Sequence, residues 1–599
     1  MRKWLLAGVG ACVIAGAAFG AWAAQPAAPA PAPAGSTAAE RFKALYTEEW
    51  KWRSDEFGSS DDTPADGRAL PDHLPHETPA DHARRLAYWE KIRERLAAID
   101  PAALPADDRV NYAIYRMQLD NMIASERFRA WEMPLNSDSA FWSNLTITAR
   151  RGFRTAGNYR NYLGQLNDMP RYFREQTANM RSGLKRGFSV PKVTLNGRDK
   201  SIADIVEASD PEKNPFYQPF LDMPSTIPAA QQAELRAQAR KAILESVIPA
   251  HRELLAFMRE EYLPKTRTTL AAEALPDGKA FYRQQIREYT TLDLSPEEIH
   301  RIGLDEVARI HAEMQTAMQA TGFKGTFAEF LTFLRTDPRF YAKTPEELLY
   351  KAAWISKKVD GKASRYFGRL PRGRFEIVPV PDNIAPYYTS ARGGPHTYYL
   401  NTYDLPSRPL YTLTALTLHE SALGHSFQLS LAEEQGEQPA FRSESYISAY
   451  GEGWGLYVEK LGKEMGLYET PYDEFGRLTF EMWRAARLVV DTGIHHKGWT
   501  RDQAIRFMTD NTALSMHDIE IEIDRYISWP GQALSYKLGE IEIWRQRRKA
   551  EAALGEKFDI RAFHDTVLSM GSVPLPVLAQ RIDQFIAEGG KGPYPIRKD

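Results

Sequence analysis

Two histidines and a glutamate between residues 411 and 428 are the side chains of this sequence best suited to metal chemistry. His419 is followed at once by Glu420, and a second histidine, His425, lies six positions after the first. Catalytic zinc takes neutral imidazoles and carboxylates as ligands and leaves one position for water. The segment therefore indicates a zinc site.

The spacing of the two histidines departs from the usual zinc helix. In the pattern H-E-x-x-H the histidines are four residues apart, which places them about 40° apart around a helix. A spacing of six places them about 120° apart, because each residue turns about 100°. They can share a metal only if the helix is distorted, which Gly424 permits as a bulge or an unwound turn. The alternative is a pair of polar histidines on a mostly buried helix.

An aromatic, helical segment downstream supplies two carboxylates. Glu452 and Glu459 are seven residues apart and therefore lie on one helix face. Glu452 is the better candidate for a third ligand, and Glu459 could orient a ligand histidine from behind. The alternative for Glu459 is a surface carboxylate that faces Lys460 or Lys463.

The elements that must position these residues are predicted to be mostly helices. Apolar residues recur at helical spacing over residues 80–99 and 229–262. Capping signals mark further helix starts at Ser295, Thr344 and Thr500. The clearest strand-like segments are residues 375–380 and 397–402. We therefore expect a mainly α protein with a small β-sheet late in the chain, and no solenoid because no fixed-period repeat is present.

Composition excludes several classes of protein. Of 599 residues, 43% are hydrophobic and 26% charged, which excludes a disordered chain and a multi-span membrane protein. The net charge of -2 and the absence of a long basic run predict no nucleic-acid partner. The single cysteine, Cys12, excludes a disulfide scaffold. A serine hydrolase is not supported, since no Gly-x-Ser-x-Gly elbow occurs.

The N-terminus is typical of an exported protein. Arg2 and Lys3 precede an apolar run, and Ala21-Trp22-Ala23 offers a small-x-small cleavage site. Export predicts a periplasmic or secreted protein with no stable membrane span after cleavage; the alternatives are a lipid anchor through Cys12 and an uncleaved anchor. The expected order is a signal peptide (1–23), a Pro/Ala-rich linker (24–37), an N-terminal helical subdomain (38–270) and a catalytic subdomain (271–599).

Several ordered motifs in the C-terminal half resemble the bacterial family labelled domain of unknown function 885. They are His-Glu-x-x-x-Gly-His from His419, Glu-Gly-Trp-x-Leu-Tyr-x-Glu from Glu452, residues 487–499, residues 525–539, Phe558-Asp559 and Phe563-His564-Asp565. Two positions depart from the family pattern. Leu423 stands where proline is usual, and Ser426 stands where a second histidine is common. Without that proline, Gly424 must carry the distortion.

The family looks like a branch of the gluzincin-type metallopeptidases, which are helical proteins with a zincin-like architecture and a deep substrate channel. The resemblance implies that zinc is bound by His419, His425 and Glu452. It also implies that Glu420 is the general base, taking a proton from zinc-bound water and delivering one to the leaving amine.

Further site residues come from the matching motifs. Tyr536 is the first candidate for the oxyanion donor, because its segment resembles one that supplies a tyrosine in helical zinc carboxypeptidases; His495 is the second. Arg487 and Arg525 could hold a substrate carboxylate. The alternatives are a core tyrosine bonded to backbone and arginines in structural ion pairs.

A strand just before the metal helix is a further candidate for substrate binding. In zincins generally an edge strand there pairs with the extended substrate backbone, which makes Tyr399 and Asn401 candidates. The alternative is an ordinary sheet strand. The preceding segment, from Tyr387 and Tyr388 to Gly394, is expected to form a flexible lip of the cleft.

Three functions stay open from the sequence. The first is an exported zinc peptidase that acts on peptides. The second is a zinc hydrolase of non-peptide amides or amino-acid conjugates. The third is a non-catalytic peptide-binding protein, against which the intact Glu420 counts. The oligomeric state is left open.

Overall fold

The computed structural model of the chain describes residues 36–57, 71–137, 139–150, 153–208, 210–382, 385, 389–443 and 445–595. The predicted signal peptide, Cys12, most of the linker, and Tyr387 and Tyr388 of the predicted lip lie outside the described residues. Within the described part, no helix is both long enough and apolar enough to cross a membrane.

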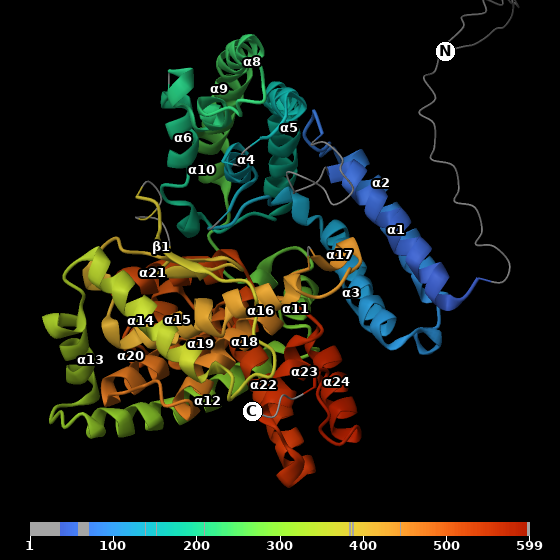
Figure 1. The fold of residues 1–599 in the computed structure, drawn as a ribbon. Helices are drawn as coiled ribbons and strands as arrows, with labels where there is room; N and C mark the ends of the chain where they lie inside the picture. The colour runs from blue at the N-terminus through green and yellow to red at the C-terminus, as the bar shows by residue number, and fades with distance from the viewer. Residues whose placement is uncertain are drawn as a thin grey trace, which may run out of the picture.

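The first half of the described chain is built from helices only. They are α1 (Ala38–Phe57), α2 (Pro79–Ala97), α3 (Ala106–Phe128), α4 (Phe141–Ala149), α5 (Ala156–Arg186), α6 (Lys200–Glu207), α7 (Gln218–Leu221), α8 (Ala229–Ala242), α9 (Ile248–Ala256) and α10 (Leu263–Lys265). Two π-helical turns join α8, α9 and α10 into one nearly continuous helix, as the apolar pattern over residues 229–262 predicted. In Figure 1, α4 to α10 form an upper group and α1 to α3 run along one side.

The second half adds further helices and the small sheet. The helices are α11 (Gly278–Thr290), α12 (Pro296–Ala320), α13 (Phe327–Thr336), α14 (Pro345–Ala363), α15 (Leu410–Thr417), α16 (His425–Glu433), α17 (Ala440–Ser443), α18 (Ser448–Glu464), α19 (Pro471–His495), α20 (Arg501–Asn511), α21 (Met516–Ser528), α22 (Ser535–Leu554), α23 (Ile560–Leu568) and α24 (Leu575–Ala587). The strands are β1 (Glu376–Pro379), β2 (Ala391–Gly393) and β3 (Thr397–Leu400). The predicted mainly helical fold with a small sheet is confirmed.

The predicted helix starts are confirmed by their caps. The side chain of Ser295 accepts from the Glu298 N–H while the Glu298 carboxylate accepts from the Ser295 N–H, and α12 begins between them. Thr344 caps α14 and Thr500 caps α20 in the same way, by accepting from a backbone N–H three residues on. These starts are predictable because each cap satisfies an otherwise unpaired N–H locally.

The sheet corrects one expectation. Its strand order is β1-β3-β2, so β3 is the central strand, paired in parallel with β1 and antiparallel with β2. An edge role for residues 397–401 is therefore wrong, because both sides of that strand already pair. Asn401 is fully buried, and its side-chain amide donates to the carbonyls of Ala385 and Thr389. The strand at the edge beside the histidines is β2.

Hydrophobic packing joins sequence-distant helices. One core cluster combines Phe42 of α1 and Tyr115 of α3 with Trp454 of α18 and Phe563 of α23. A second lies entirely within residues 74–262. In the second half, α19 packs along α12 and α18 packs along α22. The subdomain boundary near residue 270 stays a prediction.

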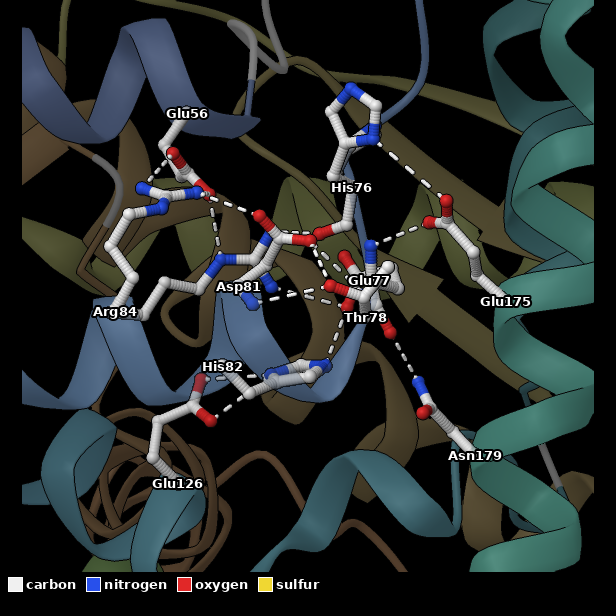
Figure 2. Close-up of polar contacts among 12 residues, drawn as sticks. Glu56, His76, Glu77, Thr78, Asp81, His82, Arg84, Glu126, Glu175 and Asn179 are labelled. Atoms are coloured by element: carbon white, nitrogen blue, oxygen red, sulfur yellow. Dashed lines mark hydrogen bonds and ion pairs between the residues drawn. The ribbon is translucent and has the colours of Figure 1, made fainter. Parts of the chain in front are cut away.

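A buried polar network ties the N-terminal helices together (Figure 2). His82 of α2 lies between two carboxylates, with Nδ1 3.0 Å from Glu126 Oε2 and Nε2 3.1 Å from Glu77 Oε2. The Glu77 N–H donates to Glu175 of α5 at 2.8 Å. The backbone carbonyl oxygen of Glu77 accepts from the Asn179 side chain at 2.6 Å. The network therefore links α2 to α3 and α5.

We expect His82→Gln to destabilise the protein more at acidic than at alkaline pH. Burial disfavours the charged ring, but hydrogen bonds and charge from Glu126 and Glu77 outweigh burial and raise the pKa of His82. A raised pKa makes this stabilisation complete below the ordinary value of about 6.5 and lost as pH rises through the folded-state value. Melting curves should show a loss of about 1.5–3 kcal/mol near pH 5.5 that shrinks near pH 9. Equal losses of stability at both pH values would contradict this. The control is His76→Gln, which changes a half-exposed ring 3.8 Å from Glu175.

Candidate metal centre

A break in the helix brings the two histidines together. α15 continues into a π-helical turn at Leu418–Ala422, and the helix then stops before α16 starts at His425. A Cβ on Gly424 would lie 1.8 Å from the carbonyl oxygen of His419, so only glycine fits there. The predicted distortion at Gly424 is confirmed. It places the rings of His419 and His425 with their centroids 4.9 Å apart and nearly perpendicular.

A carboxylate from α18 completes a three-residue cluster. Glu452 Oε2 lies 3.3 Å from His419 Nε2 and 3.4 Å from His425 Nε2. The donor atoms of the three residues all lie within 4.8 Å of one another. Zinc bonds of about 2.0–2.2 Å in a tetrahedral arrangement put ligand atoms about 3.3–3.5 Å apart. The three side chains therefore fit a zinc ion in both chemistry and spacing.

Glu459 orients the first histidine. It lies two helical turns after Glu452 on α18, is 2% exposed, and its Oε1 is 2.7 Å from His419 Nδ1. The Nδ1–H of His419 donates to this carboxylate, which leaves Nε2 with the lone pair that a metal needs. Glu459 is therefore a buried partner of His419 and does not form a surface ion pair with Lys460 or Lys463.

The electrostatics of the cluster favour a cation. Burial disfavours a charged His419, but Glu452, Glu459 and Glu420 outweigh burial and raise the pKa of His419 to about 9. Burial likewise disfavours a charged Glu452, yet the two histidines hold the pKa of Glu452 well below its usual range. Three carboxylates around two imidazoles give an excess of negative charge. A divalent cation between the donor atoms of His419, His425 and Glu452 would neutralise it.

Glu420 stands beside the cluster without joining it. Its carboxylate oxygen Oε2 accepts a hydrogen bond of 2.8 Å from the backbone N–H of Gly393 at the end of β2. β2 approaches so closely that a Cβ on Gly393 would lie 1.7 Å from the Glu420 carbonyl oxygen. The edge strand thus fixes Glu420 next to the cluster, with its side chain only partly buried.

Two tyrosines approach the cluster from different elements. The ring of Tyr536, on α22, lies nearly parallel to that of His419 at 6.5 Å. Across the described residues, nothing hydrogen-bonds with the Tyr536 hydroxyl, although the residue is only 8% exposed. Tyr446 donates from its hydroxyl to Glu452 Oε1 at 3.0 Å. Tyr446 was not predicted, because it lies outside every motif; its place just before the Glu452 helix was the one signal available.

A buried ion cluster holds α22 in place. Lys537, next to Tyr536, is 1% exposed and pairs with Glu306 of α12 at 3.0 Å and Glu481 of α19 at 2.9 Å. It also pairs with Glu540, one turn further along α22. Breaking one partner of such a cluster leaves an uncompensated buried charge. The position of Tyr536 is therefore fixed by three helices.

The remaining candidates have structural partners. His495 is fully buried, with Nδ1 accepting from the Ala272 N–H at 3.0 Å and Nε2 donating to the Tyr526 carbonyl at 2.8 Å. Burial lowers the pKa of His495 to about 3. Since both ring nitrogens bond to backbone, we do not retain His495 as an oxyanion donor.

The two predicted carboxylate-binding arginines share a protein carboxylate. Arg487 Nη2 lies 2.8 Å from Glu522 Oε2, and Arg525 Nη1 lies 3.7 Å from Glu522 Oε1. Arg525 also donates to Gln532 at 3.1 Å. Arg487 differs from Arg525 in stacking on Tyr536, with its guanidinium carbon 4.3 Å from the ring centroid. Of the pair, Arg487 is the one whose contacts among the described residues include Tyr536.

A large cavity borders the cluster at Tyr446. Its volume is about 2140 Å³, and its lining combines α1, α4 and α5 with the end of α16 and the segment leading to Tyr446. Aromatic side chains from both halves contribute, among them Trp50, Trp131 and Tyr172 from the first half and Tyr446 from the second. The cavity is large enough for an oligopeptide-sized ligand.

Comparisons with known proteins identify the family of the chain and proteins that share its fold. Residues 61–582 match the family model described as "Bacterial protein of unknown function (DUF885)". The crystal structure of "the putative lipoprotein from Colwellia psychrerythraea" is 27% identical, covers 92% of this chain and 100% of its own, and has a TM-score of 0.83. A second protein, described as "a putative lipoprotein of unknown function from Shewanella oneidensis", is 19% identical with a TM-score of 0.68, covers 91% of this chain and 99% of its own, and shares the fold. No curated protein matches the chain.

Proposed function

Because the chain belongs to the bacterial DUF885 family, we propose its function from its metal centre: it is an exported zinc-dependent peptidase that hydrolyses peptide bonds of oligopeptides. The observation that carries the proposal is the convergence of His419, His425 and Glu452 within 4.8 Å, with the carboxylate of Glu420 beside them. The proposal includes the gluzincin-type likeness, with the cavity that borders Tyr446 as the substrate channel.

The chemistry follows from the positions of the side chains. His419, His425 and Glu452 would hold a zinc ion, which when bound would supply Lewis-acid polarisation and make a nearby water more acidic. Glu420 accepts the proton of the attacking water and later gives a proton to the leaving amine. Tyr536 donates its free hydroxyl to the oxygen that becomes negative in the tetrahedral intermediate. On β2 the Gly393 N–H is already used by Glu420, so an extended peptide would pair with the remaining edge groups of this strand.

The test combines metal analysis with a digest. Protein purified without a metal-affinity tag should contain about one zinc per chain, and it should cleave members of a peptide library in a chelator-sensitive way. If the protein contained zinc and cleaved amino-acid conjugates but no peptides, the alternative function of a zinc hydrolase of non-peptide amides or amino-acid conjugates would be favoured. If the correctly folded wild-type protein contained no zinc, the proposed site would be refuted.

Export is part of the proposal. The relatives described as lipoproteins support the alternative in which the chain is lipid-anchored through Cys12. Mass spectrometry of the native N-terminus separates the two forms, since signal cleavage leaves a chain that begins at Ala24 whereas anchoring leaves an acylated Cys12.

Tyr536→Phe should lower kcat by about 10²-fold or more while zinc content stays unchanged. The substitution removes only the hydroxyl, which has no hydrogen-bond partner among the described residues, so the fold loses no contact. Steady-state kinetics and elemental analysis of the same preparation check this. An unchanged kcat would assign the oxyanion to another donor, and Tyr446→Phe is the first variant to compare.

A further inference from the structure

Arg484 of α19 is a buried cation without an anionic partner. It is 4% exposed. Its one hydrogen bond among the described residues runs from Nη1 to the Phe480 carbonyl at 3.5 Å, and its Nε has no partner. Burial lowers the pKa of Arg484, with nearby charges on Glu459 and Glu420 opposing that change. A guanidinium stays charged under these conditions, so the structure buries an unpaired positive charge.

Other buried arginines of the same region are paired with carboxylates. Arg477, two turns earlier on α19, pairs with Glu474 at 2.9 Å and Glu481 at 2.6 Å. Arg547 of α22 pairs with Glu464 and Glu551, each at 2.8 Å. Burying a charge is costly unless it is paired. Arg484 therefore differs from these two neighbouring buried arginines in lacking a carboxylate partner among the described residues.

Aromatic rings fix the Arg484 guanidinium beside the metal centre. Its central carbon lies 4.1 Å from the Trp483 ring centroid and 6.0 Å from the Tyr536 ring centroid. Arg487 stacks on the same Tyr536 ring, and its Nη1 is also buried without a partner. Two guanidinium groups with unused donors thus flank the tyrosine that stacks beside His419. Such an arrangement matches a carboxylate, which accepts parallel hydrogen bonds from guanidinium groups.

We propose that Arg484, assisted by Arg487, binds the C-terminal carboxylate of the peptide substrate, so that the enzyme is a carboxypeptidase. This inference rests on the proposed function. The Tyr536 ring lies 6.5 Å from the His419 ring and 6.0 Å from Arg484. Arg484 therefore lies no farther from the His419 ring than these two distances combined, and a peptide extends about 3.3–3.6 Å per residue, so a carboxylate at Arg484 would place the cleaved bond within a few residues of the C-terminus.

The competing explanation is that Arg484 only neutralises Glu459. Glu459 Oε2 is itself buried without a hydrogen-bond partner, but it forms no ion pair within 4.0 Å of Arg484 among the described residues. A counter-ion role and a substrate role make different predictions. A counter-ion acts through His419 on every substrate equally, whereas a carboxylate receptor acts only on substrates that carry the carboxylate.

The experiment compares matched peptides as free acids and as C-terminal amides. Binding of N-acetylated tripeptides is measured by calorimetry with zinc-loaded Glu420→Gln protein, and hydrolysis is measured with otherwise wild-type protein. We expect the free acid to be preferred by about 10- to 100-fold, the contribution of a hydrogen bond to a charged group. Arg484→Met should abolish the preference, and Arg484→Lys should retain part of it because the charge remains.

Controls separate the possible failures. Arg335→Met removes a partly buried arginine of α13 whose Nε also has no partner among the described residues, and it should leave the preference unchanged. Melting curves and zinc content identify variants that fail to fold. The inference would be overturned if the protein that retains Arg484 bound the acid and the amide equally, or bound neither of them. If Arg484→Met weakened the binding and hydrolysis of the acid and the amide equally, Arg484 would instead be the counter-ion of Glu459. Absence of hydrolysis with a retained preference for the acid would refute the peptidase and leave the carboxylate site standing.

Discussion

Replacing Glu420 by glutamine is expected to lower peptidase activity by about 10²- to 10⁴-fold while zinc content stays at the wild-type level. The glutamine amide cannot accept a proton from the attacking water. Its side-chain oxygen can still accept the hydrogen bond that Gly393 donates to Glu420 at 2.8 Å, so the contact between β2 and the π-helical turn survives. Activity assays and elemental analysis on one preparation give the two numbers needed.

The paired measurements decide between three roles for Glu420. Loss of zinc together with activity would mean that Glu420 is a ligand or a structural residue. Retention of both would mean that another group activates the water and that the proposed mechanism is wrong. Glu464→Gln is a matched control, because Glu464 lies on α18 but pairs with Arg547 away from the cluster. It should change neither quantity.

Local signals were sufficient to predict the starts of α12, α14 and α20. The starts of α12 and α20 depend on hydrogen bonds between residues three positions apart, which the sequence displays directly. The distortion at Gly424 was also predictable, because two histidines six residues apart cannot share a metal on a regular helix. The form of the distortion was not, since a π-helical turn depends on packing against α18 and β2.

Features that depend on tertiary contacts could not be predicted. β2 is three residues long and lies within the segment predicted as a flexible lip, whereas the edge role was predicted for residues 397–401, which form the central strand. His495 matches a family motif, yet its role is set by two backbone groups from distant segments. Arg484 becomes noticeable only when no carboxylate is found beside it, and absence of a partner is not a property of sequence.

His419→Ala and His425→Ala are each expected to abolish zinc binding and activity together. Each substitution removes one of three convergent ligands. The remaining histidine and Glu452 supply only two ligands, which is too few to hold zinc. Chelation should then lower the melting temperature of the wild type but not of either variant, because a ligand that binds the folded state at 100 times its Kd stabilises it by about 2.7 kcal/mol. Thermal melts with and without chelator measure this without any assay of activity.

A graded series distinguishes the ligands from the residue that orients them. Glu459→Gln keeps all three ligands but weakens the hydrogen bond of 2.7 Å to His419 Nδ1, so zinc affinity should fall by about 10- to 100-fold without being abolished. His496→Ala, at a partly exposed ring that pairs with Glu273, should leave affinity unchanged. If Glu459→Gln lost zinc as completely as His419→Ala, Glu459 would have to be a ligand, and the assignment of Glu452 would fail with it. A zinc affinity that stayed the same in all the histidine variants would place the metal elsewhere in the chain.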